Sequence, residues 1–323
     1  MKRIAFRTMG GKYIGYGHIY RCLSLAKAIV KQAITYEIIF IVNDEIKSIV
    51  RDSGFKYEVS NDFSDDYEIM NKIGLDFVIL DSYLADDFYL KNIRKNSKLM
   101  LFDDNNDIYD SEIPDVILNG NIHAKNLDYK TNNSTFFLLG TKYLVMREDY
   151  WDDVSTELIK KSGVLITTGG SDSFNISIKI LKELSGTDYF KKIVVGPGYT
   201  NEAVDEINRL KDNKTTIIMK PNGLKDHINS SEFVITASGS TVYEVISQKT
   251  IPIIFSLAEN QNTAYKYFQE YGIKTIGIFP DIHYDEIIHA LKQASKIDIG
   301  ELNNLIDGKG ALRVAHQIIL MLS

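Results

Sequence analysis

A glycine-rich loop near the start of the chain leads into a histidine. The loop follows a short apolar run at residues 3–7, contains glycines at positions 10, 11, 15 and 17, and places His18 at the start of an expected helix. Glycines let a ligand approach the backbone, and free N–H groups of a first helical turn point toward it. The helix dipole favours a neutral imidazole, which can accept a proton from water. His18 is therefore a candidate general base, although a histidine that only caps the helix fits the pattern equally well.

Two loops in the second half have the composition of phosphate-binding loops. Residues 167–172 lie between an expected strand and helix and include Gly169, Gly170 and Ser171. Residues 236–244 place small hydroxyl residues and a glycine before another helix: Ser238, Gly239, Ser240 and Thr241. Backbone N–H and hydroxyl donors that converge at a helix N-terminus can hold a pyrophosphate without a metal ion. Alone, the first loop is also explained as a plain turn capped by Asp172 or Ser173.

Further polar residues suit a nucleotide sugar. Glu244 lies one turn into the second of these helices, where a carboxylate could accept both hydroxyls of a ribose. An ordinary first-turn glutamate stabilised by the helix dipole explains it equally well. Asn260 and Gln261 follow an expected strand at 252–255 and suit sugar hydroxyls and amides.

Polar side chains also follow three expected strands of the first half. Asp81 comes after residues 78–80, Asp103 and Asp104 after 99–102, and Asn119 after 116–118. Because carboxyl ends of parallel strands meet at one edge of a sheet, we expect these groups to face a common rim. Each of them taken singly is also explained as loop composition.

Several familiar sites are excluded. The dinucleotide fingerprint fails because Tyr20 stands where its third glycine would be. No two Asp are separated by a single residue, no two His have zinc-site spacing, and no G-x-x-x-x-G-K-[ST] or G-x-S-x-G motif occurs. We therefore expect neither a metal site nor a cofactor.

Apolar runs alternate with segments of helical period, as in parallel βαβ units. The expected strands are residues 3–7, 37–42, 76–80, 98–102, 115–118, 163–167, 192–195, 215–219, 233–236 and 252–255. The clearest helices are residues 19–33, 85–96 and 313–322. A polar segment at about 147–161 separates the halves. We predict an α/β fold of two Rossmann-like domains facing each other across a cleft, residues 1–152 and 162–323, with the last helix able to pack back toward the first domain.

The composition bears on which partners the protein can bind and in which compartment it works. The 323 residues carry a formal net charge of −6, so the chain lacks the overall positive field that attracts nucleic acid or anionic membranes. The single cysteine, Cys22, rules out an internal disulfide. No window of 18 apolar residues occurs, and residues 1–11 have no signal-peptide pattern. We expect a cytoplasmic protein without nucleic-acid partners or stable membrane association, and the oligomeric state stays open.

Together these motifs resemble one family. Residues 14–23, 169–172, 237–244 and 259–261 resemble the UDP-sugar hydrolases of pseudaminic acid biosynthesis and the related spore coat polysaccharide proteins. The segments 81–83, 102–104 and 143–148 fall in the family's order, so the resemblance covers nearly the whole chain. It implies a GT-B fold like that of MurG-type glycosyltransferases, with the sugar held mainly by the first domain and UDP by the second.

The resemblance also implies roles for residues. It makes His18 the base that activates water, Tyr83 an auxiliary, and residues 238–244 the UDP site, with Asn260 and Gln261 contacting sugar or diphosphate. Gly169, Gly170 and Ser171 join the nucleotide-binding candidates. The remaining substrate-binding candidates are Arg7, Gly17, Arg21, Asp81, Asp103, Asn119, Tyr143 and Arg147. The chain has Met9, Gly10 and Gly11 where family members often have an acidic residue and serines, so its sugar could differ from theirs.

Three functions remain open. The leading hypothesis is a metal-independent, inverting hydrolase of a UDP-linked amino sugar. The second is a GT-B glycosyltransferase that uses an acceptor other than water. The third is a nucleotide-sugar-binding protein without turnover, against which His18 argues because a binding site needs no base. The absence of an exposed amphipathic segment for a lipid-linked acceptor favours the hydrolase.

Overall fold

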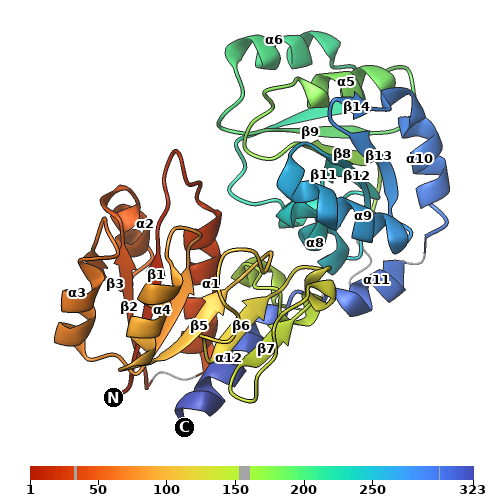
Figure 1. Ribbon diagram of the computed structural model, residues 1–323. Coiled ribbons are helices and arrows are strands. Elements are labelled where there is room, and N and C mark those ends of the chain that lie inside the picture. Colours follow the sequence, from red (N-terminus) through yellow and green to blue (C-terminus); the bar gives the residue numbers. More distant parts are fainter. Residues whose placement is uncertain (33–34, 153–160, 298) are drawn as a thin grey trace. The chain divides into compact units, whose positions relative to one another are not determined.

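The structure is a computed structural model that describes residues 1–32, 35–152, 161–297 and 299–323. These residues form two compact units. Unit 1 consists of Met1–Trp151 together with Gly308–Ser323, and unit 2 consists of Asp152–Asp307. The last helix, α12 (Gly310–Leu322), therefore belongs to unit 1, where it packs against α1 (Gly17–Gln32) (Figure 1).

The described part of unit 1 is built on one parallel sheet of seven strands in the order β3-β2-β1-β4-β5-β6-β7. The strands are β1 (Arg3–Thr8), β2 (Glu37–Val42), β3 (Lys56–Val59), β4 (Phe77–Asp81), β5 (Lys98–Phe102), β6 (Val116–Asn119) and β7 (Phe136–Leu139). The other helices are α2 (Lys47–Asp52), α3 (Asp66–Ile73) and α4 (Asp87–Arg94), with 3-10 turns η1 (Asp44–Ile46), η2 (Ala124–Asn126), η3 (Thr141–Tyr143) and η4 (Glu148–Tyr150).

Both faces of this sheet are covered, which explains why its central strands are continuous apolar runs. One core joins the sheet to α1 and α12, through side chains such as Phe6, Ile29 and Val314. The other core joins the opposite face to α3 and α4, through side chains such as Leu80 and Leu90. The central strands are thereby fixed, and so are the loops that leave their carboxyl ends.

Unit 2 has a second sheet of seven strands within its described residues, in the order β10-β9-β8-β11-β12-β13-β14. All neighbouring pairs are parallel except β13 with β14. The strands are β8 (Val164–Thr167), β9 (Lys191–Val195), β10 (Thr215–Met219), β11 (Phe233–Ala237), β12 (Ile251–Ser256), β13 (Lys274–Ile278) and β14 (Asp281–Ile282). The helices are α5 (Ile176–Glu183), α6 (Asn201–Leu210), α7 (Lys225–Asn229), α8 (Ser240–Ser247), α9 (Asn262–Glu270), α10 (Ile287–Ala294) and α11 (Ile299–Leu305), with 3-10 turns η5 (Glu259–Gln261) and η6 (Tyr284–Glu286).

Each of the two sheets has a topological switch point at the same place in its strand order. In unit 1, β2 lies on one side of β1 and β4 on the other, and in unit 2, β9 and β11 flank β8 in the same way. In α/β proteins, ligands bind at the carboxyl ends of the strands at such a switch point. The glycine-rich loops predicted from the sequence are those that follow β1, β8 and β11.

The α/β class predicted from the sequence is confirmed, and each of the ten expected strands is present to within one residue at each end. The sequence patterns missed β3, β7, β13 and β14. The end of the expected helix at 19–33 lies partly outside the described residues.

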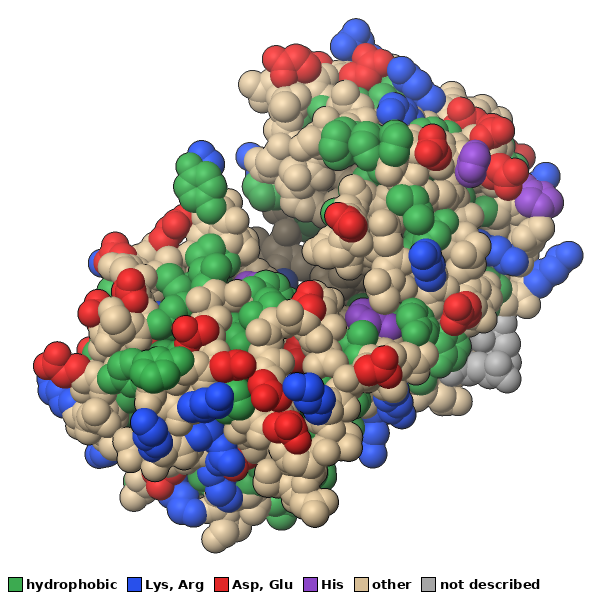
Figure 2. Space-filling view, viewed as in Figure 1, with side chains coloured by type: hydrophobic (Ala, Val, Ile, Leu, Met, Phe, Trp, Pro, Cys, Tyr) green, Lys and Arg blue, Asp and Glu red, His purple; other side chains and the backbone are tan. Residues whose placement is uncertain are grey.

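The surface shows no broad field of one sign on the face seen in Figure 2, where acidic and basic side chains are interspersed. In the described part of the chain, no helix combines the length and apolar character needed to cross a membrane.

Candidate active site and nucleotide-binding loops

The loop after β1 is held by its own glycines and by Asn43, which follows β2. Gly11 and Gly15 form a β-bridge, with N···O distances of 3.1 and 2.7 Å. Their φ angles, 137° and 89°, lie in the region that favours glycine. Asn43 donates from Nδ2 to the Gly10 carbonyl at 2.8 Å and accepts from the Gly10 N–H at 3.0 Å. The backbone therefore reaches the start of α1 along a fixed path.

His18 is the second residue of α1 and is bound to the end of β4. Its Nδ1 lies 2.7 Å from Oδ1 of Asp81, the last residue of that strand. Thr8 of β1 aligns with Asp81 in the parallel pair, so the start of α1 and the end of β4 meet at the switch point. The Asp81 side chain is fully buried, whereas the His18 side chain keeps 14% of its surface exposed.

Asp81 fixes the tautomer of His18. It also accepts two hydrogen bonds from Arg21, at 2.5 Å from Nε and 2.6 Å from Nη2. Burial alone would raise the pKa of Asp81, but the Arg21 guanidinium and the hydrogen bonds from Arg21 and His18 lower it well below its usual range. An ionised carboxylate only accepts hydrogen bonds, so Nδ1 of His18 carries the proton that faces it. In the neutral ring, Nε2 then has the lone pair that can accept a proton.

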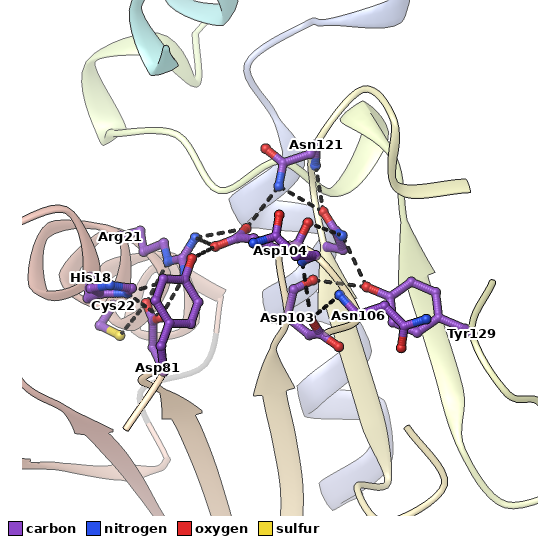
Figure 3. A network of polar contacts seen from close by, with 12 residues as sticks. His18, Arg21, Cys22, Asp81, Asp103, Asp104, Asn106, Asn121 and Tyr129 are labelled. Atoms are coloured by element: carbon purple, nitrogen blue, oxygen red, sulfur yellow. Dashed lines mark hydrogen bonds and ion pairs between the residues drawn. The ribbon is translucent and has the colours of Figure 1, made fainter. Parts of the chain in front are cut away.

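A second carboxylate, Asp104, extends the network beyond Asp81. Nη1 of Arg21 lies 2.8 and 3.1 Å from the two carboxylate oxygens of Asp104. Asp104 also accepts from Nδ2 of Asn121 at 2.9 Å and from the Tyr83 hydroxyl. Figure 3 shows this network, which joins α1 to the segments that follow β4, β5 and β6.

The ring of Tyr83 packs against the ring of His18. The two rings meet edge to face, with centroids 4.9 Å apart and an interplanar angle of 84°. Burial and the neighbouring Asp104 carboxylate raise the pKa of Tyr83 well above its usual value. Tyr83 is therefore a neutral phenol whose proton points to Asp104.

Arg7, a predicted substrate-binding residue, lies in a different cluster. Its side chain is fully buried, and its Nε donates to Oδ2 of Asp66 at 2.6 Å. The Tyr89 hydroxyl donates to the same oxygen at 2.6 Å, and the guanidinium lies 4.6 Å from the centre of the Phe63 ring. Arg7 thus bonds within the core between the sheet, α3 and α4, and does not belong to the His18 network.

Asp103 and Asn119 shape the loops around Asp104. Asp103 accepts from the backbone N–H groups of Asn105 and Asn106 at 3.2 and 2.7 Å. Asn119 is fully buried, and its Nδ2 donates to the Asp104 carbonyl at 3.1 Å. Asn119 and one carboxylate oxygen of Asp103 are therefore engaged by the protein itself, whereas Oδ2 of Asp103 is buried without a hydrogen-bond partner among the described residues. Asp104, which the sequence places on the same rim but not among the substrate-binding candidates, holds the central position.

The other candidates in unit 1 lie outside the hydrogen-bond network of Asp81 and Asp104. Gly17 is the first residue of α1, and a Cβ added there would meet nothing within 4 Å. Tyr143 ends η3 and packs half-buried against the core. Arg147 is 53% exposed in its side chain and lies 3.4 Å from Asp149.

In unit 2, the loop after β8 packs on the loop after β9 through backbone glycines and through the hydroxyls of Thr168 and Tyr199, which lie 2.8 Å apart. The Gly198 N–H donates to the Gly170 carbonyl at 2.8 Å. A Cβ added to Gly196 would lie only 2.4 Å from the same oxygen. Gly169 has a φ of 96°. The sequence prediction missed Gly196 and Gly198, which the Gly-Pro-Gly sequence after β9 could have indicated.

The same loop ends in a cap for α5. Asp172 accepts from the backbone N–H groups of Ile176 and Ser177, both at 2.8 Å, so capping by Asp172 is confirmed. The Ser171 carbonyl accepts from the Thr168 hydroxyl at 3.0 Å, and the Ser171 side chain lies in the exposed part of the loop.

The loop after β11 lies beside the loop after β8, because these strands are paired in the sheet. It leads into α8, whose N-cap residue Gly239 has no side-chain cap, so the first-turn N–H groups point out of the helix end. Ser238 donates from Oγ to the Gln261 carbonyl at 3.3 Å, and Nε2 of Gln261 is 3.7 Å from the position of a Cβ on Gly239.

Three further candidates of unit 2 lie on the same elements. Ser240 and Thr241 open α8, and Glu244 lies half-buried further along that helix. Asn260 belongs to η5 together with Gln261. Among the described residues, no three His, Cys, Asp or Glu side chains are grouped so that they could hold a metal ion.

No protein-family model matches the chain. The uncharacterized protein MJ1062 of Methanocaldococcus jannaschii is 29% identical over 98% of this chain, and the chain spans 66% of that protein's length. The UDP-2,4-diacetamido-2,4,6-trideoxy-beta-L-altropyranose hydrolase of Campylobacter jejuni is 25% identical over 84% of this chain and 97% of the hydrolase. The spore coat polysaccharide biosynthesis protein SpsG of Bacillus subtilis is 21% identical over 94% of each chain.

Solved structures show the same fold at low identity. The glycosyltransferase of kitacinnamycin has a TM-score of 0.70 and 11% identity over 98% of both chains. MurG of Acinetobacter baumannii has a TM-score of 0.60 and 13% identity over 100% of this chain and 99% of MurG. The comparisons therefore confirm the GT-B type α/β fold, and they confirm the resemblance of this chain to the UDP-sugar hydrolases of pseudaminic acid biosynthesis and the spore coat polysaccharide proteins.

Proposed function

We propose that the protein hydrolyses a UDP-linked acetamido or diacetamido deoxy sugar at the anomeric carbon with inversion, releasing free sugar and UDP. The reaction would serve the biosynthesis of a pseudaminic acid-like sugar or a surface polysaccharide. The observation that carries the proposal is the 2.7 Å contact of His18 Nδ1 with the buried carboxylate of Asp81, at the switch point of unit 1. The relatives named as a UDP-sugar hydrolase and a spore coat protein support it.

In this mechanism His18 is the general base. The oxygen of a water molecule bonds to the anomeric carbon while Nε2 of His18 takes a proton from that water. The bond between the anomeric carbon and the diphosphate oxygen breaks, and its electron pair leaves with UDP. Attack on the face opposite the leaving group inverts the configuration. Asp81 stabilises the imidazolium that forms, because its negative charge lies beside the protonated ring.

Unit 2 would bind the UDP part. The N–H groups at the start of α8 and the hydroxyls of Ser238, Ser240 and Thr241 supply donors for the diphosphate. The backbone of Gly169 and Gly170 leaves room for a phosphate beside them. Glu244 would accept hydrogen bonds from the ribose hydroxyls, and Gln261 next to Gly239 would contact the diphosphate or the sugar.

The test is incubation with a panel of UDP-sugars, with and without acceptors, followed by UDP release. Turnover in oxygen-18 water identifies the bond that breaks. Label in the free sugar and none in UDP supports attack on carbon. Label in a phosphate product, or formation of UMP, would overturn the mechanism and leave the fold unaffected.

A glycosyltransferase that uses another acceptor is the second candidate. The solved structures with this fold include the glycosyltransferase of kitacinnamycin and MurG, which favours it. UDP release that requires an added acceptor, with the sugar recovered on that acceptor, would identify a transferase.

A further inference from the structure

Asp104 is bound on both oxygens by the protein itself. Its two oxygens accept two contacts from Arg21, one from Asn121 and one from the Tyr83 hydroxyl. A carboxylate offers about four acceptor sites, and protein donors lie at both oxygens. Each oxygen of Asp104 thus already accepts from two protein donors, and its side chain keeps 21% of its surface exposed.

Arg21 is shared between two carboxylates that lie at the ends of different strands. Nε and Nη2 face Asp81, while Nη1 faces Asp104. The planar guanidinium holds its donors in a fixed fork, so the Asp104 contact also sets the plane in which Arg21 meets Asp81. Two anions share this cation, which leaves Asp81 with negative charge for the ring of His18.

The same carboxylate also orients Tyr83. The hydroxyl is bound to Asp104, and this direction of the side chain turns the ring edge-to-face against His18 at a centroid distance of 4.9 Å. Thus His18 is held at Nδ1 by Asp81 and at its ring by Tyr83. Both supports lead to Asp104.

We propose that Asp104 is a positioning residue for the hydrolysis: it holds Arg21 against Asp81 and Tyr83 against His18, and so orients the imidazole without contacting the substrate. The kinetic part of this inference rests on the proposed function. The structural part does not, because the contacts are made within unit 1.

The kinetic test uses Asp104→Asn, which keeps the shape and removes the charge. Loss of the hydrogen-bond partners that orient metal-binding histidines costs about 10- to 100-fold. For Asp104→Asn we expect kcat to fall by a similar factor, while KM and UDP affinity change less than about twofold. Asp52→Asn is the matched control, because Asp52 is exposed and forms an ion pair with Arg51 at the end of α2. An Asp104→Asn variant that raises KM at constant kcat would overturn the proposal, since that result indicates direct substrate binding.

A double-mutant cycle with Tyr83→Phe tests whether Asp104 acts on His18 through the Tyr83 hydroxyl. If Asp104 acts partly through the Tyr83 hydroxyl, the double variant loses less activity than the product of the two single losses. Strictly multiplicative losses would contradict this route.

Two spectroscopic measurements test the role of Asp104 without depending on turnover. Nitrogen-15 spectra of the His18 ring should show Nδ1 protonated in the wild type and a mixture of ring states in Asp104→Asn. A pH titration monitored through the carbon-13 signals of labelled tyrosine should show that Asp104→Asn lowers the pKa of Tyr83 toward its usual value. If the wild type releases UDP from no sugar in the panel, the proposed function fails, and these spectra still decide the role of Asp104. Unchanged spectra in the variant would overturn it.

Discussion

The two units place their candidate residues at the same point of the same strand order, but they present different chemistry there. In unit 1 the switch point holds charged side chains from α1 and the strand ends, each bound to a partner, as in the His18–Asp81 pair. In unit 2 it holds backbone glycines and small hydroxyl residues, as in the contact of Gly198 with Gly170. Topology fixes where a site can form, and the residues at the loop starts decide its chemistry.

This difference assigns separate tasks to the units. A network of paired charges holds one imidazole for proton transfer, which is a requirement of turnover. Backbone N–H groups and hydroxyls around a helix start bind an anion with no reacting group, which is a requirement of affinity. Variants of unit 1 should therefore change kcat, and variants of unit 2 should change UDP binding.

The largest effect is expected for His18→Ala. The variant should lose about 100- to 10,000-fold in kcat, because general-base catalysis contributes that much. UDP affinity, measured by calorimetry, should stay at the wild-type value since the imidazole acts on water. A variant that keeps half of the wild-type rate would remove His18 from the mechanism, and a variant that loses UDP affinity would break the division between the units.

Glu244→Ala should act on affinity instead. Loss of a charge-assisted hydrogen bond to the ribose costs about 1.5 to 3 kcal/mol, so UDP binding should weaken by roughly 10- to 150-fold. Calorimetry with UDP and with inorganic pyrophosphate separates ribose recognition from diphosphate recognition, because only UDP carries the ribose. Unchanged UDP affinity would mean that Glu244 is only a helix residue.

A smaller effect on UDP binding is expected for Gly196→Ala. The added Cβ would lie 2.4 Å from the Gly170 carbonyl, so the loop after β8 must shift to admit it. Overpacking of this kind costs about 1 to 3 kcal/mol of stability, and the displaced loop should bind UDP less well. The control is Gly223→Ala, because a Cβ on Gly223 would meet nothing within 4 Å. Equal UDP affinities for the two variants would show that the Gly169–Gly170 backbone takes no part in binding.

The sequence predicts the buried central strands of this fold well, and the four strands that it misses lie at or next to an edge of a sheet, although the edge strand β10 is predicted. Central strands such as β4 are buried throughout, so they appear as apolar runs. The strand β3, in contrast, lies at the edge of its sheet with exposed residues, and β7 is a four-residue run at the other edge. A short apolar run alone does not distinguish a strand from a helix.

The same limit applies to the site. His18 was predicted because its place after a glycine loop is a local feature of the sequence. Arg7 is a substrate-binding candidate of the sequence, and the structure pairs it with Asp66, 59 positions away. No local pattern shows such a pairing. Asp103 and Asp104 are adjacent, and the path of the loop decides which one faces α1. One local feature does point to a carboxylate beside α1: Arg21 lies three residues after His18, and so on the same face of the helix.

The smallest effect is expected from removal of divalent cations. A diphosphate leaving group must have its charge balanced, and many enzymes use a cation held by carboxylates for this purpose. In unit 2 the groups that would balance it are the uncapped N–H groups at the start of α8 and the hydroxyls around them. Because these donors belong to the protein, EDTA should leave the rate of UDP release within about twofold of its starting value, a change of less than about 0.5 kcal/mol. A rate that falls with EDTA and returns when magnesium is added would show that a cation shares the diphosphate charge with these loops. That result would contradict the chemistry assigned to unit 2 and leave the chemistry assigned to unit 1 unchanged.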